Sequence, residues 1–245
     1  MLKSQLPSLN QLFNSINVDL NTVVINKKFV NFWKHYDSAI GILSVGDFVI
    51  FRGKIKNNIP KDFNQKSYLQ LYNFFDEVYI YSLLYKQTGH KPNFIKEDKQ
   101  KKPDMKLKVN KQLSIIEVKH ISYSDNEIKL NDSYFHRALN KQKQSFESVE
   151  LNVHPTFFKK IDVNIENALT QISSHTTIFS CGIIFLILRL DHNAFADLAF
   201  NKPSSIISYL NSKRMMLKSI VRQIDLRVIY DTFASSEERF ISLLV

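Results

Sequence analysis

Residues 65–87 carry hydrophobic side chains at the spacing of an amphipathic helix. The apolar positions are Tyr68, Leu71, Tyr72, Phe75, Val78, Tyr79 and Leu83. Side chains three and four residues apart share one face of a helix, so this pattern predicts a helix with one buried side. Gly89 follows the last apolar position and suits a helix C-terminus, where glycine readily takes positive φ. We therefore expect one long helix that ends near Gln87.

Two strands are predicted further along the chain. In residues 103–109, apolar and polar side chains alternate, which is typical of a strand with one face buried. Residues 113–121 begin with apolar side chains on both faces, as central strands do. Asn110 and Lys111 lie between the two segments and suit a turn. We expect a β-hairpin here.

The remaining pattern completes a mixed α/β core. A short strand is predicted at residues 93–96, a helix at 163–174 with Asp162 as its N-cap, and a buried strand at 181–190. The resulting order is helix, strand, strand, strand, helix, strand. This order predicts a mixed central β-sheet flanked by helices on both faces.

Outside residues 65–190 the pattern is weaker. Residues 40–51 are predicted as one or two strands with a turn at Gly46-Asp47. Residues 122–160 are polar and mixed, and we interpret them as an insertion with a helix near 133–148. After the core we expect a basic helix at 204–223, a strand at 226–230 and a short C-terminal helix. We therefore divide the chain into an N-terminal extension, residues 1–60, and a main domain, residues 61–245.

Composition and charge narrow the class of protein. The 245 residues are 44% hydrophobic, and Cys181 is the single cysteine, which excludes an intrachain disulfide framework or a cysteine-based zinc cage. We expect a cytoplasmic protein without a signal peptide or membrane helix. The net charge of +10 favours a polyanion such as nucleic acid as partner. The alternative is that the lysine richness merely reflects an AT-rich genome.

Glu117 and Lys119 are the first candidates for chemistry. The pattern Glu-x-Lys also occurs at residues 97–99 and 127–129, so it means little alone in a lysine-rich chain. Only Glu117 and Lys119 interrupt an apolar strand, and their spacing places both side chains on one face. Charges in such a place are costly unless they are paired or bind a metal.

Asp104 is expected to lie next to Glu117. If Asn110 and Lys111 form a two-residue turn, antiparallel partners have numbers that sum to 221, and Asp104 stands opposite Glu117. Two like charges so placed repel each other and call for a cation between them. A three-residue turn would instead put them on opposite faces. Carboxylates are hard oxygen ligands that suit Mg²⁺, which can activate water for phosphodiester hydrolysis.

These residues resemble the PD-(D/E)XK nuclease superfamily, which has the restriction-endonuclease-like fold. The matching residues are Pro103-Asp104 and Glu117-Val118-Lys119, and the element order matches an αβββαβ core with N- and C-terminal additions. The resemblance implies that Asp104, Glu117 and the Val118 carbonyl bind Mg²⁺, with Mn²⁺ as the alternative ion. It implies that Lys119 is the catalytic lysine.

The resemblance also implies two further site residues. Members often add an acid on the preceding helix, where Glu77 fits and Asp76 is the neighbouring candidate. Many carry a glutamine or lysine on the helix after the third strand, and Gln171 falls at that place. The resemblance covers residues 65–190 and leaves the N-terminal 60 and C-terminal 55 residues unexplained.

The sequence thus predicts a metal-dependent nuclease that hydrolyses DNA, with RNA as the second choice, and that works as a homodimer or in a larger nuclease complex. One alternative is a non-catalytic nucleic-acid-binding subunit of a defence or mobile-element complex on the same fold. Another is a structural α/β domain in which Glu117 and Lys119 belong to a salt-bridge network.

Overall fold

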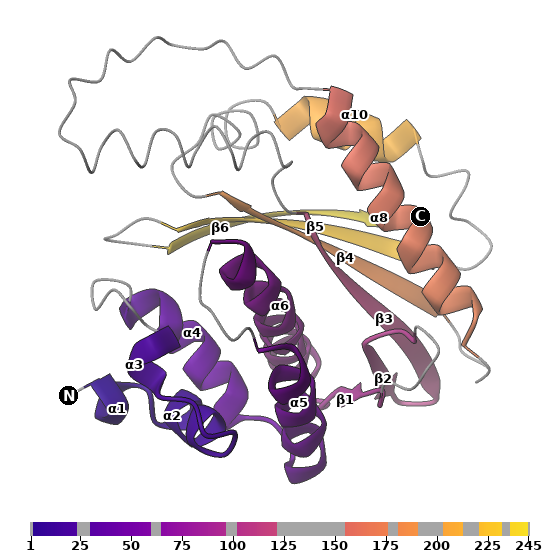
Figure 1. The fold of residues 1–245 in the computed structure, drawn as a ribbon. Coiled ribbons are helices and arrows are strands. Elements are labelled where there is room, and N and C mark those ends of the chain that lie inside the picture. The colour runs from indigo at the N-terminus through magenta and orange to yellow at the C-terminus, as the bar shows by residue number, and fades with distance from the viewer. Residues whose placement is uncertain are drawn as a thin grey trace, which may run out of the picture.

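A mixed β-sheet with helices on both faces forms the centre of the molecule (Figure 1). The computed structural model describes residues 2–23, 30–59, 65–96, 102–121, 155–175, 181–190, 203–212, 221–231 and 236–244. The strands are β1 (Asn93–Phe94), β2 (Met105–Val109), β3 (Gln112–Ile121), β4 (Cys181–Leu190), β5 (Val221–Asp231) and β6 (Ser236–Leu244). The helices are α1 (Leu2–Gln5), α2 (Pro7–Asn14), α3 (Leu20–Val23), α4 (Val30–Gly41), α5 (Val45–Asn58), α6 (Gln65–Thr88), α8 (Pro155–Ser173) and α10 (Pro203–Ser212).

The six strands of the described sheet follow one another in chain order. β1, β2 and β3 pair antiparallel, β3, β4 and β5 pair parallel, and β6 returns antiparallel to β5. Parallel neighbours need a crossover connection, and α8 and α10 lie in the two crossovers of this sheet. The antiparallel hairpin β2–β3 therefore sits beside the parallel half, with β3 shared by both.

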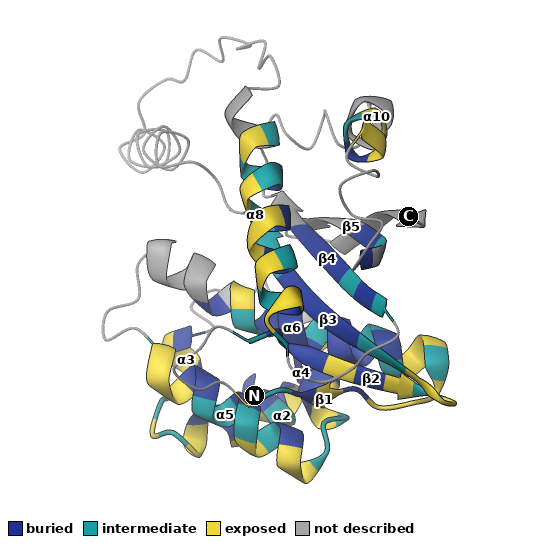
Figure 2. Cartoon of the chain, turned by 90° about the vertical axis from the view of Figure 1, so that its right-hand side faces the viewer, coloured by how far each residue is buried: buried dark blue, intermediate teal, exposed yellow. Residues whose placement is uncertain are grey.

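Helices α6 and α8 cover opposite faces of β3 (Figures 1 and 2). Successive side chains of a strand point to opposite faces. His120 of β3 accordingly contacts Asp76 of α6, whereas Lys119 contacts Gln171 of α8. Along the described part of the chain, no helix combines the length and apolar character that crossing a membrane requires.

The helices of residues 1–60 share a hydrophobic core with α6 and the sheet. Phe75 of α6 lies at its centre, with ring centroids 5.5 Å from Trp33, 5.1 Å from Tyr36 and 5.9 Å from Phe51. The same buried cluster extends from Leu2 at one end of the sequence to Phe185 and Ile187 on β4. Apolar contacts thus cross the boundary that we drew between residues 60 and 61, and that boundary remains a prediction.

The predicted elements of the central region are confirmed. Helix α6 covers the predicted helix and ends before Gly89, which has a φ of 72°. Strands β2, β3 and β4 correspond to the three predicted strands, and the predicted strand at 93–96 shortens to β1. The coarse fold class, a mixed α/β sheet flanked by helices, is therefore correct.

The prediction of strands at residues 40–51 is wrong. This segment contains the end of α4 and the start of α5. Ser44 is the N-cap of α5, because its Oγ accepts a hydrogen bond from the Asp47 backbone N–H. Phe51 and Ile55, one turn apart, are then fully buried against the core. The apolar run fits a strand or a buried helix equally well, and the cap together with the core selects the helix.

Near the C-terminus one prediction is correct in part and one is wrong. The helix expected at residues 204–223 is present as α10, whereas residues 221–223 already belong to β5, which contains the strand expected at 226–230. Residues 213–220 lie outside the described part of the chain. The C-terminal helix is instead strand β6, which pairs with β5 from Asp231↔Ser236 to Gln223↔Leu244. Pairing with neighbouring strands of the sheet accounts for both differences, because β5 pairs with β4 and β6 pairs with β5.

Helix α8 begins earlier than predicted. It starts at Pro155, so Asp162 lies inside the helix and is not its N-cap. Residues 155–160 of the predicted insertion form the first turns of this helix. The rest of the insertion, including the helix expected at 133–148, lies outside the described residues.

Candidate functional site

The β2–β3 hairpin brings Asp104 next to Glu117. Asn110 takes a φ of 54° in the two-residue turn, and the paired residues run from Val109↔Gln112 to Met105↔Ile116. This is the predicted register. Continued by one residue beyond Met105↔Ile116, it places Asp104 opposite Glu117. The Asp104 backbone N–H donates a hydrogen bond to Glu117 Oε2 at 3.2 Å.

Pro103 ends the hairpin's ladder beside Val118. In an antiparallel pair, every second residue forms backbone hydrogen bonds to the partner strand. In β3 these residues include Ile116, and the following one is Val118. Its partner in the register would be Pro103, which has no N–H to offer the Val118 carbonyl. The Val118 N–H instead donates to Asp104 Oδ2 at 2.8 Å. The Asp104 carboxylate is thereby held at the point where the two strands part.

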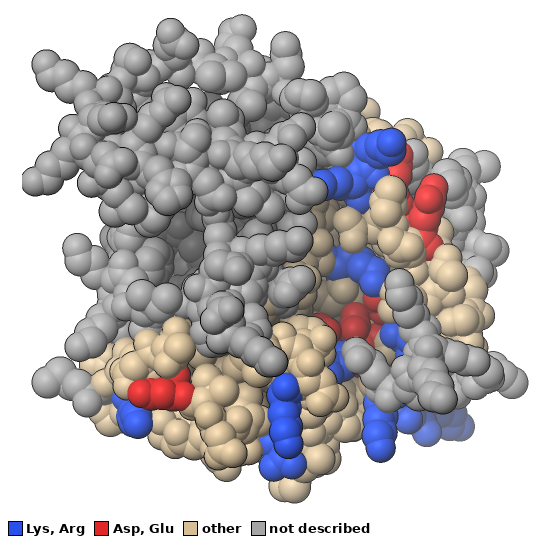
Figure 3. Space-filling model, in the orientation of Figure 1, with Lys and Arg blue, Asp and Glu red and all other residues tan. Residues whose placement is uncertain are grey.

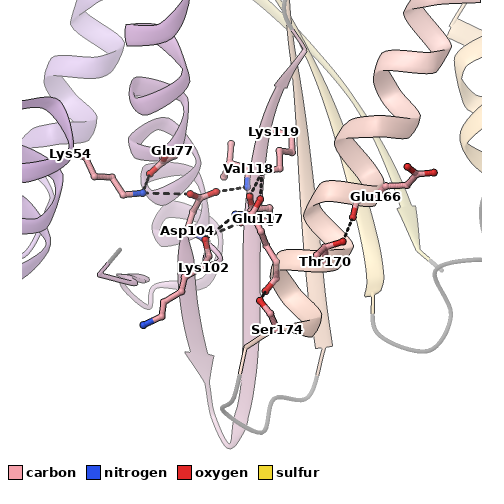
Figure 4. Close-up of polar contacts among 11 residues, drawn as sticks. Lys54, Glu77, Lys102, Asp104, Glu117, Val118, Lys119, Glu166, Thr170 and Ser174 are labelled. Carbon is pink, nitrogen blue, oxygen red and sulfur yellow. Dashed lines mark hydrogen bonds and ion pairs between the residues drawn. The ribbon is translucent and has the colours of Figure 1, made fainter. Parts of the chain in front are cut away.

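Lys119 is fixed by two acceptors on the α8 side of the sheet. Its Nζ forms an ion pair with Glu117 Oε1 and donates to Gln171 Oε1 at 2.5 Å. The Gln171 Nε2 donates to the Lys102 carbonyl at 2.9 Å, which fixes the direction of the amide. Gln171 thus ties α8 to Lys119 and to the segment just before Asp104. The structure brings these sequence-predicted residues into one group, and Figure 4 shows Glu117 and Lys119 side by side in it.

Glu77 joins the same group through Lys54, a residue that the sequence analysis missed. Lys54 Nζ lies 2.7 Å from Glu77 Oε2 and 3.5 Å from Asp104 Oδ1. The Lys54 side chain is only 4% exposed, and its ammonium lies 5.8 Å from the centre of the Phe94 ring. Asp104 therefore lies between the α5–α6 pair and β3, as Figure 4 shows.

The neighbouring acid on α6, Asp76, belongs to a different group. Its side chain is fully buried, and it accepts hydrogen bonds from the Tyr36 hydroxyl at 3.1 Å. Its other oxygen lies 2.8 Å from His120 Nδ1, on the face of β3 that is turned away from Lys119. Of the two candidates on α6, Glu77 is therefore the one beside Asp104.

Burial and crowded charge perturb Glu117. Loss of solvent, and then the nearby negative charge of Asp104, raise the pKa of Glu117 well above its ordinary value. The charge of Lys119 opposes this shift, and the charge of Glu77 adds to it. A raised pKa is expected where carboxylates are crowded together away from water. Such perturbed pKa values are common at functional sites.

Basic and acidic side chains lie close together on one face of the molecule (Figure 3). On the face shown in Figure 3, acidic side chains lie in a recess bordered by basic ones. Lys106 and Lys108 project from the exposed face of β2. Burial, and then the charges of Lys106 and Lys102, lower the pKa of His175 just after α8.

The donor chemistry suits a hard divalent cation, but the carboxylates are directed at ammonium groups. Glu77, Asp104 and Glu117 supply oxygen ligands of the kind that Mg²⁺ prefers. Lys54 lies against Glu77 and Asp104, and Lys119 against Glu117. In this arrangement, no three histidine, cysteine or acidic side chains of the described residues are grouped to hold a metal ion. The carboxylates fit such an ion chemically once the ammonium groups of Lys54 and Lys119 move away from them.

Comparisons of this chain with protein families, with curated proteins and with solved structures found no match. The function must therefore be argued from the residues of the site themselves.

Proposed function

We propose that this protein is a metal-dependent nuclease that hydrolyses phosphodiester bonds in DNA, with a restriction-endonuclease-like αβββαβ core. One observation carries the proposal: Asp104 contacts Glu117, Glu117 contacts Lys119 and Lys119 contacts Gln171, so the motif residues and the glutamine that the resemblance implies form one connected group. The order of α6, β1, β2, β3, α8 and β4 supports it.

Four groups of the chain are suited to hold Mg²⁺. They are the carboxylates of Glu77, Asp104 and Glu117 and the backbone carbonyl of Val118. Pro103 cannot donate to that carbonyl, so the hairpin does not compete for it. When bound, Mg²⁺ would supply an activated water and stabilise charge on the scissile phosphate.

Lys119 is suited to act on the phosphate or the attacking water. Glu117 and Gln171 hold its ammonium in place, so little ordering is needed when substrate binds. Its side chain is 19% exposed, so a ligand in the recess can reach it. Gln171 is a positioning residue, since it acts through Lys119.

The basic surface supports a nucleic-acid substrate. The chain carries a net charge of +10, and Lys106 and Lys108 are exposed on β2, two and four residues after Asp104. Lysines in such positions contact phosphates without reading sequence, and the binding they give weakens as salt concentration rises.

Cleavage assays with matched variants test the proposal. Supercoiled, linear and single-stranded DNA, and RNA, are incubated with the purified chain in Mg²⁺, in Mn²⁺ and in chelator. We expect metal-dependent DNA cleavage, and at least about a 100-fold loss in Asp104→Ala, Glu117→Ala and Lys119→Ala. Glu166→Ala, an exposed acid on α8, is the control and should cleave normally.

Circular dichroism verifies that each variant is folded. Cleavage by Asp104→Ala at the wild-type rate would refute the site. Salt-sensitive DNA binding without cleavage in any metal would favour the alternative, a nucleic-acid-binding subunit that has no catalytic activity.

A further inference from the structure

Lys54 occupies an unusual position for a lysine. Its side chain is 4% exposed, although lysine is almost never buried unless it is paired. It reaches the site from α5, a helix outside the αβββαβ core, and its ammonium contacts two carboxylates at once, those of Glu77 and Asp104. The Phe94 ring lies on another side of the ammonium.

This environment is one that stabilises a cation. Two carboxylate oxygens lie within 3.5 Å of Lys54 Nζ, and an aromatic face attracts positive charge. The same two carboxylates would otherwise repel each other and Glu117 in a buried place. The ammonium therefore does for Glu77 and Asp104 what a divalent cation would do.

We propose that Lys54 is an internal counter-ion of this site, which holds Glu77 and Asp104 when no divalent cation is bound and competes with that cation for them. The inference rests on the proposed function, because it assigns Lys54 the control of metal binding at the same site. It accounts for the contacts that the Lys54 ammonium makes with both Glu77 and Asp104.

Competition has a measurable consequence for metal affinity. A cation binds only to the fraction of molecules in which Lys54 has released its carboxylates, so the apparent Kd exceeds the intrinsic one by the inverse of that fraction. Removing the ammonium while keeping the length of the side chain should tighten metal binding. It should also destabilise the metal-free chain, because buried carboxylates lose their partner.

The test measures Mg²⁺ binding without any substrate. The full chain is freed of metal with a chelator, and Mg²⁺ is titrated by calorimetry and by thermal unfolding. We expect Lys54→Met to lower the apparent Kd for Mg²⁺ by about tenfold or more and to lower the metal-free Tm. Lys56→Met, an exposed lysine on the same helix, is the control and should match the wild type.

A second variant keeps the test decisive if Lys54→Met does not fold. Lys54→Arg retains the charge, and its planar guanidinium can hold both carboxylates at once. We expect it to raise the apparent Kd for Mg²⁺ several-fold while the metal-free Tm is kept or raised.

The outcomes separate this inference from the proposed function. If the wild type cleaves DNA and binds Mg²⁺ while Lys54→Met and Lys54→Arg bind it with the wild-type Kd, the inference fails and the nuclease stands. Weaker binding in Lys54→Met also overturns it, since Lys54 would then assist the cation. A wild type that neither binds a divalent cation nor cleaves overturns both.

Discussion

Lys54 and Lys119 approach the site from its two sides, and their surroundings differ. The Lys54 side chain is 4% exposed and contacts two carboxylates and an aromatic ring. The Lys119 side chain is 19% exposed and contacts one carboxylate and one neutral amide, that of Gln171. Lys54 is thus enclosed by acidic partners inside the protein, whereas Lys119 has a single acidic partner and is partly open to solvent.

The two environments suggest two different roles for a lysine at this site. A lysine between two carboxylates balances charge that the fold itself has buried, so its removal affects stability and metal affinity. A lysine held by a carboxylate and an amide is oriented without being fully neutralised, so its removal affects a reaction with an anion. Variants of the acidic and amide partners test this contrast.

Glu77→Ala should have the largest effect on stability. It removes the closest partner of a buried ammonium, and such losses cost about 3 kcal/mol. Urea unfolding of the metal-free chain measures the change in the free energy of unfolding. Lys54→Met combined with Glu77→Leu should recover most of it. Glu166→Ala, on the exposed side of α8, should change it by less than about 0.5 kcal/mol. A loss in Glu77→Ala no greater than in this control would contradict the assignment.

Glu117→Gln should stabilise the metal-free chain at alkaline pH. Because the pKa of Glu117 is raised above 4.5, the folded chain binds this proton more tightly than the unfolded chain does. The free energy of unfolding therefore falls as pH rises from 4.5 through the raised pKa. Above that window the neutral amide avoids a buried charge and should add on the order of 1–2 kcal/mol.

Denaturant unfolding of wild type and Glu117→Gln across pH 4 to 9, in chelator, measures this effect. The variant should lack the part of the pH slope that Glu117 contributes, and it should also lose cleavage. A variant that is less stable than the wild type at pH 8 would show that the ion pair with Lys119 outweighs burial.

Gln171→Leu should have the smallest effect of the three. It removes the amide that accepts from Lys119 and donates to the Lys102 carbonyl, and a hydrogen bond of this kind contributes about 1 kcal/mol. DNA cleavage should fall about fivefold, with the apparent Kd for Mg²⁺ unchanged. Thr170→Ala, whose exposed hydroxyl bonds only to its own helix at Glu166, is the control. A loss as large as that of Lys119→Ala would make Gln171 more than a positioning residue.

The hairpin part of the site follows from local sequence. Alternation sets which side chains share a face, and the two-residue turn at Asn110 sets the register. Together they place Asp104, Glu117 and Lys119 with no knowledge of the rest of the chain. The contact between the Val118 N–H and Asp104, for example, spans only 14 residues.

The other part of the site is decided by tertiary packing. Lys54 is 23 residues from Glu77, and Lys119 is 52 residues from Gln171. Residues 40–51 have a pattern that fits a strand, and only the Ser44 cap and the burial of Phe51 against Phe75 make it the helix that carries Lys54 towards the site. A signal was present in Ser44-x-x-Asp47, a capping pattern that the analysis of the apolar run did not use.

The sequence by itself determined the central αβββαβ order and the hairpin acids, because period-two alternation and turn length act between close neighbours. The tertiary structure alone decided that Lys54 is buried and that Glu77 rather than Asp76 lies beside Asp104. These outcomes depend on which surfaces, distant in the chain, exclude water together, and no local pattern encodes that choice.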